Sequence, residues 1–382
     1  MSLYIKGGKV FLPDKSVSYN TLLIEGKLIS GIIPTEYRPG SKDKVIDATG
    51  MMVVPGFIDI HIHGAFGKDS IEGTCESIKT IGRFISSHGT TSYLPTIGTF
   101  ESGLVMKSIH NIMACTPPED GARQLGVHIE GPYLNVEHRG AQQKDMIRSP
   151  DPSEYQEWLE TEAVKLVTIA PEVENALDFI DLGTKQGVEF AIGHSGARYE
   201  QVIEAVEHGL RQASHLYNGM SGLHHRAPGP VGAILTDDRI FAQIIADGVH
   251  VHPAMVKLAV LAKGVSRIIL ISDSIPGTGL DDGDYDYYGQ KFTVKNGIAR
   301  TPEGGLSGST LMLDQAIVNM MRFTGLPLNE VLPMATSIPA EAMGWDERIG
   351  MIKPGADADI TILDEDLEVE KTFVLGREVF SK

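Results

Sequence analysis

Short runs of β-branched residues, interrupted by glycine, occur at both ends of the chain. Residues 3–11 and 21–33 contain the glycines of IKGGKVF and IEGKLISG, a pattern typical of hairpins. Residues 356–364 (ADADITILD) and 368–380 (EVEKTFVLGREVF) show the same pattern. We therefore expect one small β-sandwich domain built from both termini, over residues 1–53 plus 349–382.

The middle of the chain, residues 54–348, alternates apolar runs with amphipathic segments. Residues 76–89 place Ile78, Ile81 and Ile85 at helical spacing, and glycine ends this segment, which predicts a helix. Near-continuous apolar runs between such helices are typical of buried parallel strands. Eight runs fit this description: 55–64, 91–98, 124–131, 164–172, 188–196, 211–218, 241–248 and 267–274. Eight strand–helix repeats predict an α/β fold, a (β/α)8 TIM barrel.

Charge and composition narrow the classes of partner. The 382 residues include 33 Lys plus Arg and 50 Asp plus Glu, a formal charge of -17. Such an acidic surface repels phosphate backbones and anionic lipid, so nucleic acid and membranes are expected to be poor partners. A small anionic substrate would need a local basic pocket. The acidic, Tyr-rich stretch 281–289 is expected to be a solvated loop.

The two cysteines and the N-terminal segment bear on location. Cys75 and Cys115 lie in neither a CxxC nor a CxxH spacing, so we expect neither a disulfide nor a thiolate metal site, as in a reducing compartment. The first residues lack a signal-peptide core, and no apolar run approaches the roughly 18 residues of a membrane span. The expected location is the cytoplasm.

Polar residues gather where the predicted strands end. His61 and His63 end the first strand, Glu130 the third, and His194 the fifth. His215 and Asp273 end the sixth and eighth strands. In a TIM barrel these ends share the face on which active sites are built. Imidazole and carboxylate groups suit zinc or iron.

A structural role is the alternative for each of these residues taken alone, because one strand-end histidine often only makes a hydrogen bond. His61 and His63 alternate along a strand and so face the same side, the barrel interior. Two buried imidazoles without a metal would need other polar partners. The five residues together therefore favour a catalytic metal site.

The motifs carry a family resemblance over nearly the whole chain. PGFIDIHIHG and KPGADADITIL resemble the amidohydrolase superfamily. HIEGPYLN, GHSGA, SHLYNGM, HHRAPG, DGVHVHP and ISDS more specifically resemble the N-acetylglucosamine-6-phosphate deacetylases. The resemblance implies hydrolysis of the acetamide of N-acetylglucosamine 6-phosphate to glucosamine 6-phosphate and acetate, in amino-sugar metabolism.

The same resemblance implies roles for matching positions. Glu130, His194 and His215 match the ligands of the principal metal. His61 and His63 match ligands of a second metal, with Glu130 as a bridge, so one or two divalent ions per subunit are expected, zinc or iron. Asp273 is implied as the general acid and base, a group that amide hydrolysis requires.

Further positions are implied to bind substrate. The phosphate is expected to meet His250 and Arg226, together with Asn218 and Gly219. Arginine offers a planar fork that matches phosphate oxygens. In this family that arginine can come from a neighbouring subunit, which implies a homodimer. Leu306 and Ser307 match a loop that lines the substrate.

Two departures from the family pattern concern substrate contacts. Gln142 stands where many members have a histidine in a Gly-x-His pattern, and its amide can donate a hydrogen bond to the substrate carbonyl without carrying charge. Ser307 replaces a more usual alanine. The alternatives left open are another amidohydrolase, such as a cyclic-amide hydrolase or a deacetylase for a different amino sugar, and a barrel protein without catalysis.

Overall fold

Eight parallel strands in the middle of the chain form the predicted barrel. The structure is a computed structural model that describes residues 2–382. Within them, β8 pairs with β11, and the order continues through β13, β14, β15, β16 and β17 to β18. Asp273 N donates to His61 O, and His63 N to Ser274 O, both at 2.9 Å, so the last strand meets the first where the site residues stand. The barrel strands are β8 (Phe57–Ile62), β11 (Thr90–Ile97), β13 (Val127–Glu130), β14 (Val164–Ile169), β15 (Glu189–Ile192), β16 (Gln212–Ala213), β17 (Phe241–Ile244) and β18 (Ile268–Leu270). A short strand, β12 (Arg123–Gln124), pairs in parallel with β11 at Ser92 and Tyr93, on the edge opposite β8.

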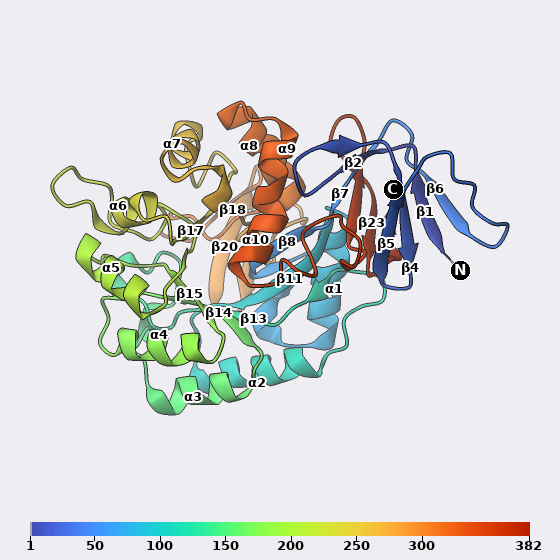
Figure 1. Cartoon of the computed structure of the whole chain (residues 1–382). Helices are drawn as coiled ribbons and strands as arrows, with labels where there is room; N and C mark the ends of the chain where they lie inside the picture. The colour runs from blue at the N-terminus through green and yellow to red at the C-terminus, as the bar shows by residue number, and fades with distance from the viewer. Residues whose placement is uncertain (1) are drawn as a thin grey trace.

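Helices cover the outside of the barrel (Figure 1). Helix α1 buries Ile78, Ile81 and Ile85 as its periodicity predicts, and Thr74 and Ser77 form its capping box, which satisfies free backbone N–H groups of the first turn. The helices are α1 (Cys75–Ser86), α2 (Ser102–Ala114), α3 (Pro152–Glu160), α4 (Ala176–Lys185), α5 (Tyr199–His208), α6 (Gly229–Thr236), α7 (Pro253–Lys263), α8 (Leu313–Thr324), α9 (Leu328–Val331) and α10 (Ser337–Ala342).

The two ends of the chain meet in a pair of sheets beside the barrel (Figure 1). One sheet has the order β5-β4-β1-β6, and the other has the order β24-β23-β22-β7-β2-β3, which mixes N- and C-terminal strands. Apolar side chains of both sheets share one core that includes Ile24, Val53 and Phe373, so the predicted sandwich is confirmed. Its strands are β1 (Leu3–Lys6), β2 (Lys9–Phe11), β3 (Val17–Ser18), β4 (Thr21–Glu25), β5 (Leu28–Ile33), β6 (Lys44–Asp47), β7 (Met52–Pro55), β22 (Ile360–Leu363), β23 (Val369–Val374) and β24 (Arg377–Ser381).

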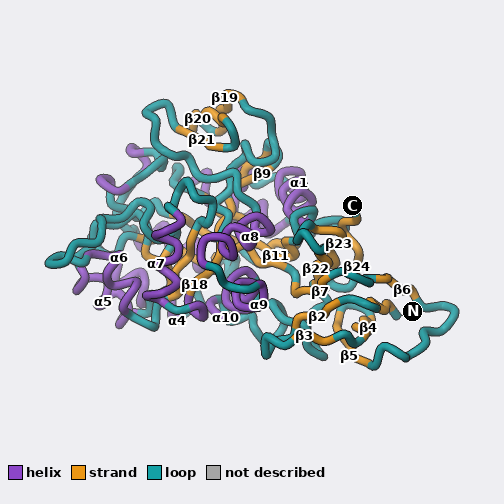
Figure 2. The backbone as a smooth tube through the Cα atoms, turned by 90° about the horizontal axis from the view of Figure 1, so that it is seen from above, coloured by secondary structure: helices purple, strands orange, loops and turns teal. Residues whose placement is uncertain are grey.

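A three-stranded sheet stands at one edge of the barrel, where the sequence predicted only a solvated loop (Figure 2). It consists of β19 (Gly283–Tyr287), β20 (Gln290–Lys295) and β21 (Ile298–Arg300). The acidic side chains of Asp284 and Asp286 are exposed as expected, but Tyr285 and Tyr287 pack on a small core around Phe292. Alternating Asp and Tyr is a period of two, which a half-buried strand satisfies.

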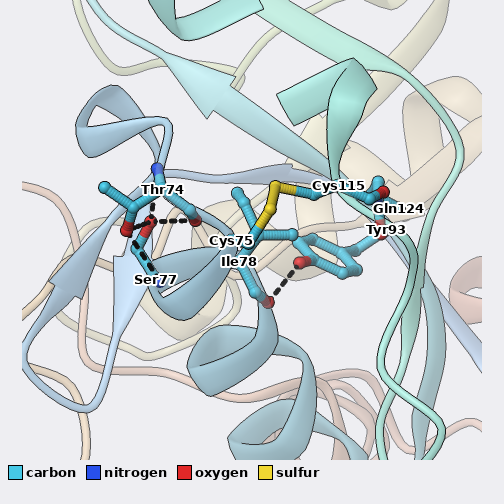
Figure 3. Close-up of a disulfide and its surroundings, with 7 residues drawn as sticks. All are labelled: Thr74, Cys75, Ser77, Ile78, Tyr93, Cys115 and Gln124. Carbon is cyan, nitrogen blue, oxygen red and sulfur yellow. Dashed lines mark hydrogen bonds between the residues drawn. A yellow bond between two sulfur atoms is a disulfide. The ribbon is translucent and has the colours of Figure 1, made fainter. Parts of the chain in front are cut away.

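Cys75 and Cys115 form a disulfide, which the sequence did not predict (Figure 3). Cys75 begins α1 and Cys115 follows the last residue of α2. The two helices bring Cα atoms 40 residues apart to within 5.2 Å, inside the range that a disulfide needs. Spacing along the chain could not reveal this contact, and the cysteine-based argument for a reducing compartment does not hold.

The helices around the barrel are short. The longest of those among residues 2–382, α2, has 13 residues. No helix in this described part of the chain is both long enough and apolar enough to cross a bilayer.

Candidate active site

Six site residues predicted from strand ends lie together at one mouth of the barrel. His61 and Glu130 lie within strands β8 and β13, and His63 follows β8 directly. His194, His215 and Asp273 follow the fifth, sixth and eighth strands, and their φ angles are 48°, 31° and 49°. These left-handed conformations are uncommon outside glycine and often mark functional sites.

The carboxylate of Glu130 stands at the centre of the cluster. Its Oε1 lies 2.9 Å from His215 Nε2, 3.2 Å from His194 Nε2 and 3.3 Å from His61 Nε2. Its Oε2 lies 3.1 Å from His63 Nε2. Oε1 therefore faces three histidines and Oε2 faces the fourth.

The hydrogen bonds on the far side of two imidazole rings define their protonation. Nδ1 of His194 lies 3.0 Å from the carbonyl oxygen of His138, and Nδ1 of His215 lies 3.1 Å from that of Asn218. A carbonyl only accepts, so both Nδ1 atoms carry hydrogen and, in neutral rings, both Nε2 atoms present lone pairs to Glu130. Two acceptors this close need a proton or a metal ion between them, and carbonyl-anchored imidazoles are typical of metal ligands.

His61 supports the same conclusion from a different observation. Its ring is fully buried, and among residues 2–382 its Nε2 atom has no hydrogen-bond partner. An unsatisfied buried polar atom is costly. Nitrogen and oxygen atoms from His61, Glu130 and His215, and from His61, His63 and Asp273, come close enough together to hold a metal.

The close contacts in the cluster shift the pKa values of Glu130 and His63 in opposite directions. Burial by itself would raise the pKa of Glu130, but the charge of a protonated His61 ring, and the hydrogen bonds that His194 and His215 donate when both of their ring nitrogens carry hydrogen, hold it well below its usual range. Burial would lower the pKa of His63, but Asp273 and Glu130 raise it well above its usual range. A divalent cation meets the same electrostatic demand.

Asp273 faces the two histidines of the first strand. Its Oδ1 lies 3.5 Å from His61 Nε2 and 3.4 Å from His63 Nε2. Burial would raise the pKa of Asp273, but the charge of His61 and a hydrogen bond with His63 lower it. A carboxylate that stays ionised can accept a proton, as a general base must.

A cavity of about 320 Å3 opens above the cluster, which is within the range of small-molecule sites. Its lining contains most of the predicted residues: His63, Glu130, Gln142, His194, His215, Asn218, Gly219, His250, Asp273, Leu306 and Ser307. Its lining residues, all from the described part of the chain, include neither lysine nor arginine.

Apart from the fully buried His61, Arg226 is the predicted site residue that does not line this cavity. It lies exposed on the segment before α6, and its Nη1 lies 2.7 Å from Nε2 of the neighbouring His225. A side chain that bonds its own loop and faces solvent cannot clamp a ligand in its own barrel in this conformation.

Several lining residues were not predicted from the sequence. Tyr287, Gln290 and Phe292 come from the β19–β21 sheet, and Asp69 ends a short strand, β10 (Lys68–Asp69), within the loop segment between β8 and α1. Burial raises the pKa of Asp69 to about 6. These residues carry no strand-end signal, because insertions after barrel strands are placed only by folding.

Asp247 is a further site residue that no sequence pattern had assigned. Its Oδ2 lies 2.7 Å from His250 Nδ1, and its Oδ1 accepts the backbone N–H groups of Val249 and His250 at 2.8 and 2.7 Å. The spacing Asp-x-x-His in DGVHVHP was the available signal. The carboxylate holds the His250 ring in one orientation at the cavity wall.

The barrel, its strand-end cluster and the buried carboxylate define a class, the metal-dependent hydrolases built on a TIM barrel. Comparison with known families agrees: the amidohydrolase family model matches residues 52–379. The chain belongs to the amidohydrolase family.

Individual relatives extend the motif resemblance. The N-acetylglucosamine-6-phosphate deacetylase of Bacillus subtilis (strain 168) is 34% identical over 93% of this chain and 91% of its own. The N-acetylgalactosamine-6-phosphate deacetylase of Escherichia coli O157:H7 is 35% identical over 87% of this chain and 89% of its own. One solved structure is a variant of the Mycobacterium smegmatis N-acetyl-D-glucosamine-6-phosphate deacetylase in complex with N-acetyl-D-glucosamine-6-phosphate. It superposes with a TM-score of 0.90 at 29% identity and covers 100% of this chain and 99% of its own. The resemblance inferred from the motifs is confirmed.

Proposed function

We propose that this chain hydrolyses the acetamide of N-acetylglucosamine 6-phosphate to glucosamine 6-phosphate and acetate, in amino-sugar metabolism. One observation carries the proposal. The cluster around Glu130 and Asp273 lies beneath a small-molecule cavity, in a chain that is aligned over most of its length with deacetylases of that name.

The metal would be held by the histidines and carboxylates described above. Glu130, His194 and His215 are proposed as ligands of the principal ion, and His61 and His63, bridged by Glu130, as ligands of a second. Zinc or iron fits this donor set, with one or two ions per subunit. A divalent cation there would supply Lewis-acid chemistry, which lowers the pKa of water so that it loses a proton and attacks an amide at neutral pH.

Asp273 would move the proton in both halves of the reaction. Its carboxylate accepts a proton from the attacking water as the C–O bond forms at the acetamide carbonyl. It then donates that proton to the nitrogen as the C–N bond breaks, so that amine and acetate leave. One residue can perform both steps, since it returns to its ionised form after each turnover.

The substrate would lie across the cavity, with its phosphate away from the cluster. His250, Asn218 and Gly219 are proposed to contact the phosphate, and Gln142, Leu306 and Ser307 the sugar and acetyl group. Since Arg226 lies outside its own cavity, we place Arg226 of the partner subunit at the phosphate. The functional unit is then a homodimer. Its cytoplasmic location stays a prediction.

A turnover assay with metal quantification tests the proposal. The protein is given N-acetylglucosamine 6-phosphate and, in parallel, the unphosphorylated sugar, and released acetate is measured. We expect turnover of the phosphorylated sugar to dominate. Equal turnover of both would favour a different amidohydrolase activity, and an inactive protein that never retains a divalent metal would favour a barrel without catalysis.

N-acetylgalactosamine 6-phosphate is the second candidate substrate, because a relative of that name is 35% identical. The two sugars differ in configuration at one hydroxyl group, so the same assay with both phosphates separates them. A higher kcat/KM for the galactosamine derivative would reassign the substrate without changing the chemistry.

A further inference from the structure

The side chain of Gln142 is held at both ends within the site. Thr99 N donates to its Oε1 at 2.9 Å, and its Nε2 donates to Glu130 Oε2 at 2.5 Å. Because a backbone N–H only donates, the amide oxygen must face Thr99 and the NH2 group must face the carboxylate. Gln142 is 8% exposed, so water does not readily replace either bond.

These contacts close a ring between two neighbouring barrel strands. Thr99 follows β11 and Glu130 ends β13, and these strands are paired. Thr99 Oγ1 also donates to the backbone oxygen of Glu130 at 3.3 Å. The ring therefore fixes the Glu130 carboxylate to the backbone that carries it.

The orientation of that carboxylate matters because its oxygens face different groups. The final torsion of a glutamate side chain is broad, so the chain itself does not define the carboxylate plane. In the structure Oε1 faces His61, His194 and His215, while Oε2 faces His63. Gln142 donates to Oε2, the oxygen next to the proposed second metal position.

We propose that Gln142 is a positioning residue that orients Glu130 as a bridge between two metal positions, and that its loss weakens chiefly the metal beside His63. This inference rests on the proposed metal site. Mutating a hydrogen-bond partner of a metal ligand typically weakens metal affinity by about 10- to 100-fold. We expect a loss of that size for the metal at the His63 position. The contact between Gln142 and substrate stays a separate prediction, because an amide nitrogen has two donor hydrogens.

The test compares Gln142→Leu with a matched control, Gln143→Leu. Gln143 is the next residue, and its Nε2 has no hydrogen-bond partner among residues 2–382. Each full-length protein is stripped with chelator and titrated with Co2+, and both the bound stoichiometry and the Co2+ absorption spectrum are recorded. The wild type and the control should bind two ions, whereas Gln142→Leu should bind one tightly and the second about 10- to 100-fold more weakly.

A second variant separates positioning from folding. Gln142→Asn keeps the amide but is shorter by one methylene group, so it should recover one of the two bonds and part of the affinity. Unchanged binding of both ions by Gln142→Leu would overturn the inference. So would equal weakening of both ions together with a lowered melting temperature. A wild type that binds no divalent metal would instead contradict the proposed function itself.

Discussion

Glu130 connects the other residues of the site, because each of its oxygens meets a different set of imidazoles. The rings of His194 and His215 are oriented by backbone carbonyls, so their Nε2 atoms are directed before any ion binds. Preorganised ligands lose little conformational freedom on binding. At this scale the chemistry depends on a few hydrogen bonds that define tautomers and orientation.

Replacing Asp273 by asparagine tests proton transfer. The Asp273→Asn variant keeps the size and polarity of the side chain, but its amide cannot accept a proton, so kcat should fall by about 10² to 10⁴. Steady-state kinetics give kcat, and elemental analysis checks that metal is retained. Near-normal kcat across neutral pH would mean that another group is the base.

Replacing Asp247 tests the orientation of His250. Asp247→Ala removes the partner of His250 Nδ1 and two backbone hydrogen bonds. A charge-assisted hydrogen bond contributes about 1.5 to 3 kcal/mol, so KM for the phosphorylated sugar should rise about 10-fold or more while kcat changes little. Asp238→Ala removes the same charge from an exposed position and should leave KM unchanged. A fall in kcat without a change in KM would contradict a role in phosphate binding.

The elements around the barrel mouth come from insertions between strands and helices. The β19–β21 sheet contributes Tyr287, Gln290 and Phe292 to the cavity, and the loop after β8 contributes Asp69. That loop is anchored to α2, because Ser108 Oγ donates to Ile71 O at 2.6 Å. The disulfide joins α1 to the end of α2 in the same region (Figure 3).

Removing the disulfide tests what this link contributes to stability. The cysteines are 40 residues apart, and closing a loop of that length corresponds to about 4 kcal/mol in the chain-entropy model. Cys75→Ser with Cys115→Ala should therefore lower the free energy of unfolding, measured in denaturant, by an amount of that order. A thiol assay on unfolded, unreduced wild type should find no free thiol. Two free thiols per chain would show that the bond does not form.

At the scale of the whole molecule, the protein carries the same sign of charge as the phosphorylated substrate. The net charge is -17, and no arginine or lysine of the described chain lines the cavity. Because the lining offers histidine but neither lysine nor arginine, we propose that a cation from outside the subunit joins His250 at the phosphate. Arg226, whose exposed side chain bonds the neighbouring His225 ring, is the residue proposed for that role across a symmetric interface.

Mixing two impaired variants tests whether the site is shared. Arg226→Ala lacks the clamp and Asp273→Asn lacks the base, but in a mixed dimer one site receives an intact copy of each. With random exchange of subunits in a closed dimer, about a quarter of all sites should be restored.

Size exclusion chromatography of each variant provides the control for dimer formation. Arg226→Lys should recover only part of kcat/KM, because an ammonium group keeps the charge and loses the fork. Absence of any restored activity in mixed dimers would place Arg226 in its own subunit or outside the site.

The sequence by itself determined the barrel, the terminal β domain and the strand-end cluster. Eight buried strands are visible as apolar runs. The strand ends share one face of the barrel, which brings His61, Glu130 and Asp273 together independently of how the helices pack. The exact domain boundaries, at 53/54 and 348/349, and the role of each site residue stay predictions.

Only the tertiary structure decided the disulfide, the cavity wall from β19–β21 and the clamped amide of Gln142. These depend on distances between segments far apart in the chain, such as the 5.2 Å between the Cα atoms of Cys75 and Cys115. Local spacing and periodicity report which face of an element is buried, but not which other element covers it. The position of Arg226 outside its own cavity is a result of the same kind, since loop conformation follows from packing and not from pattern.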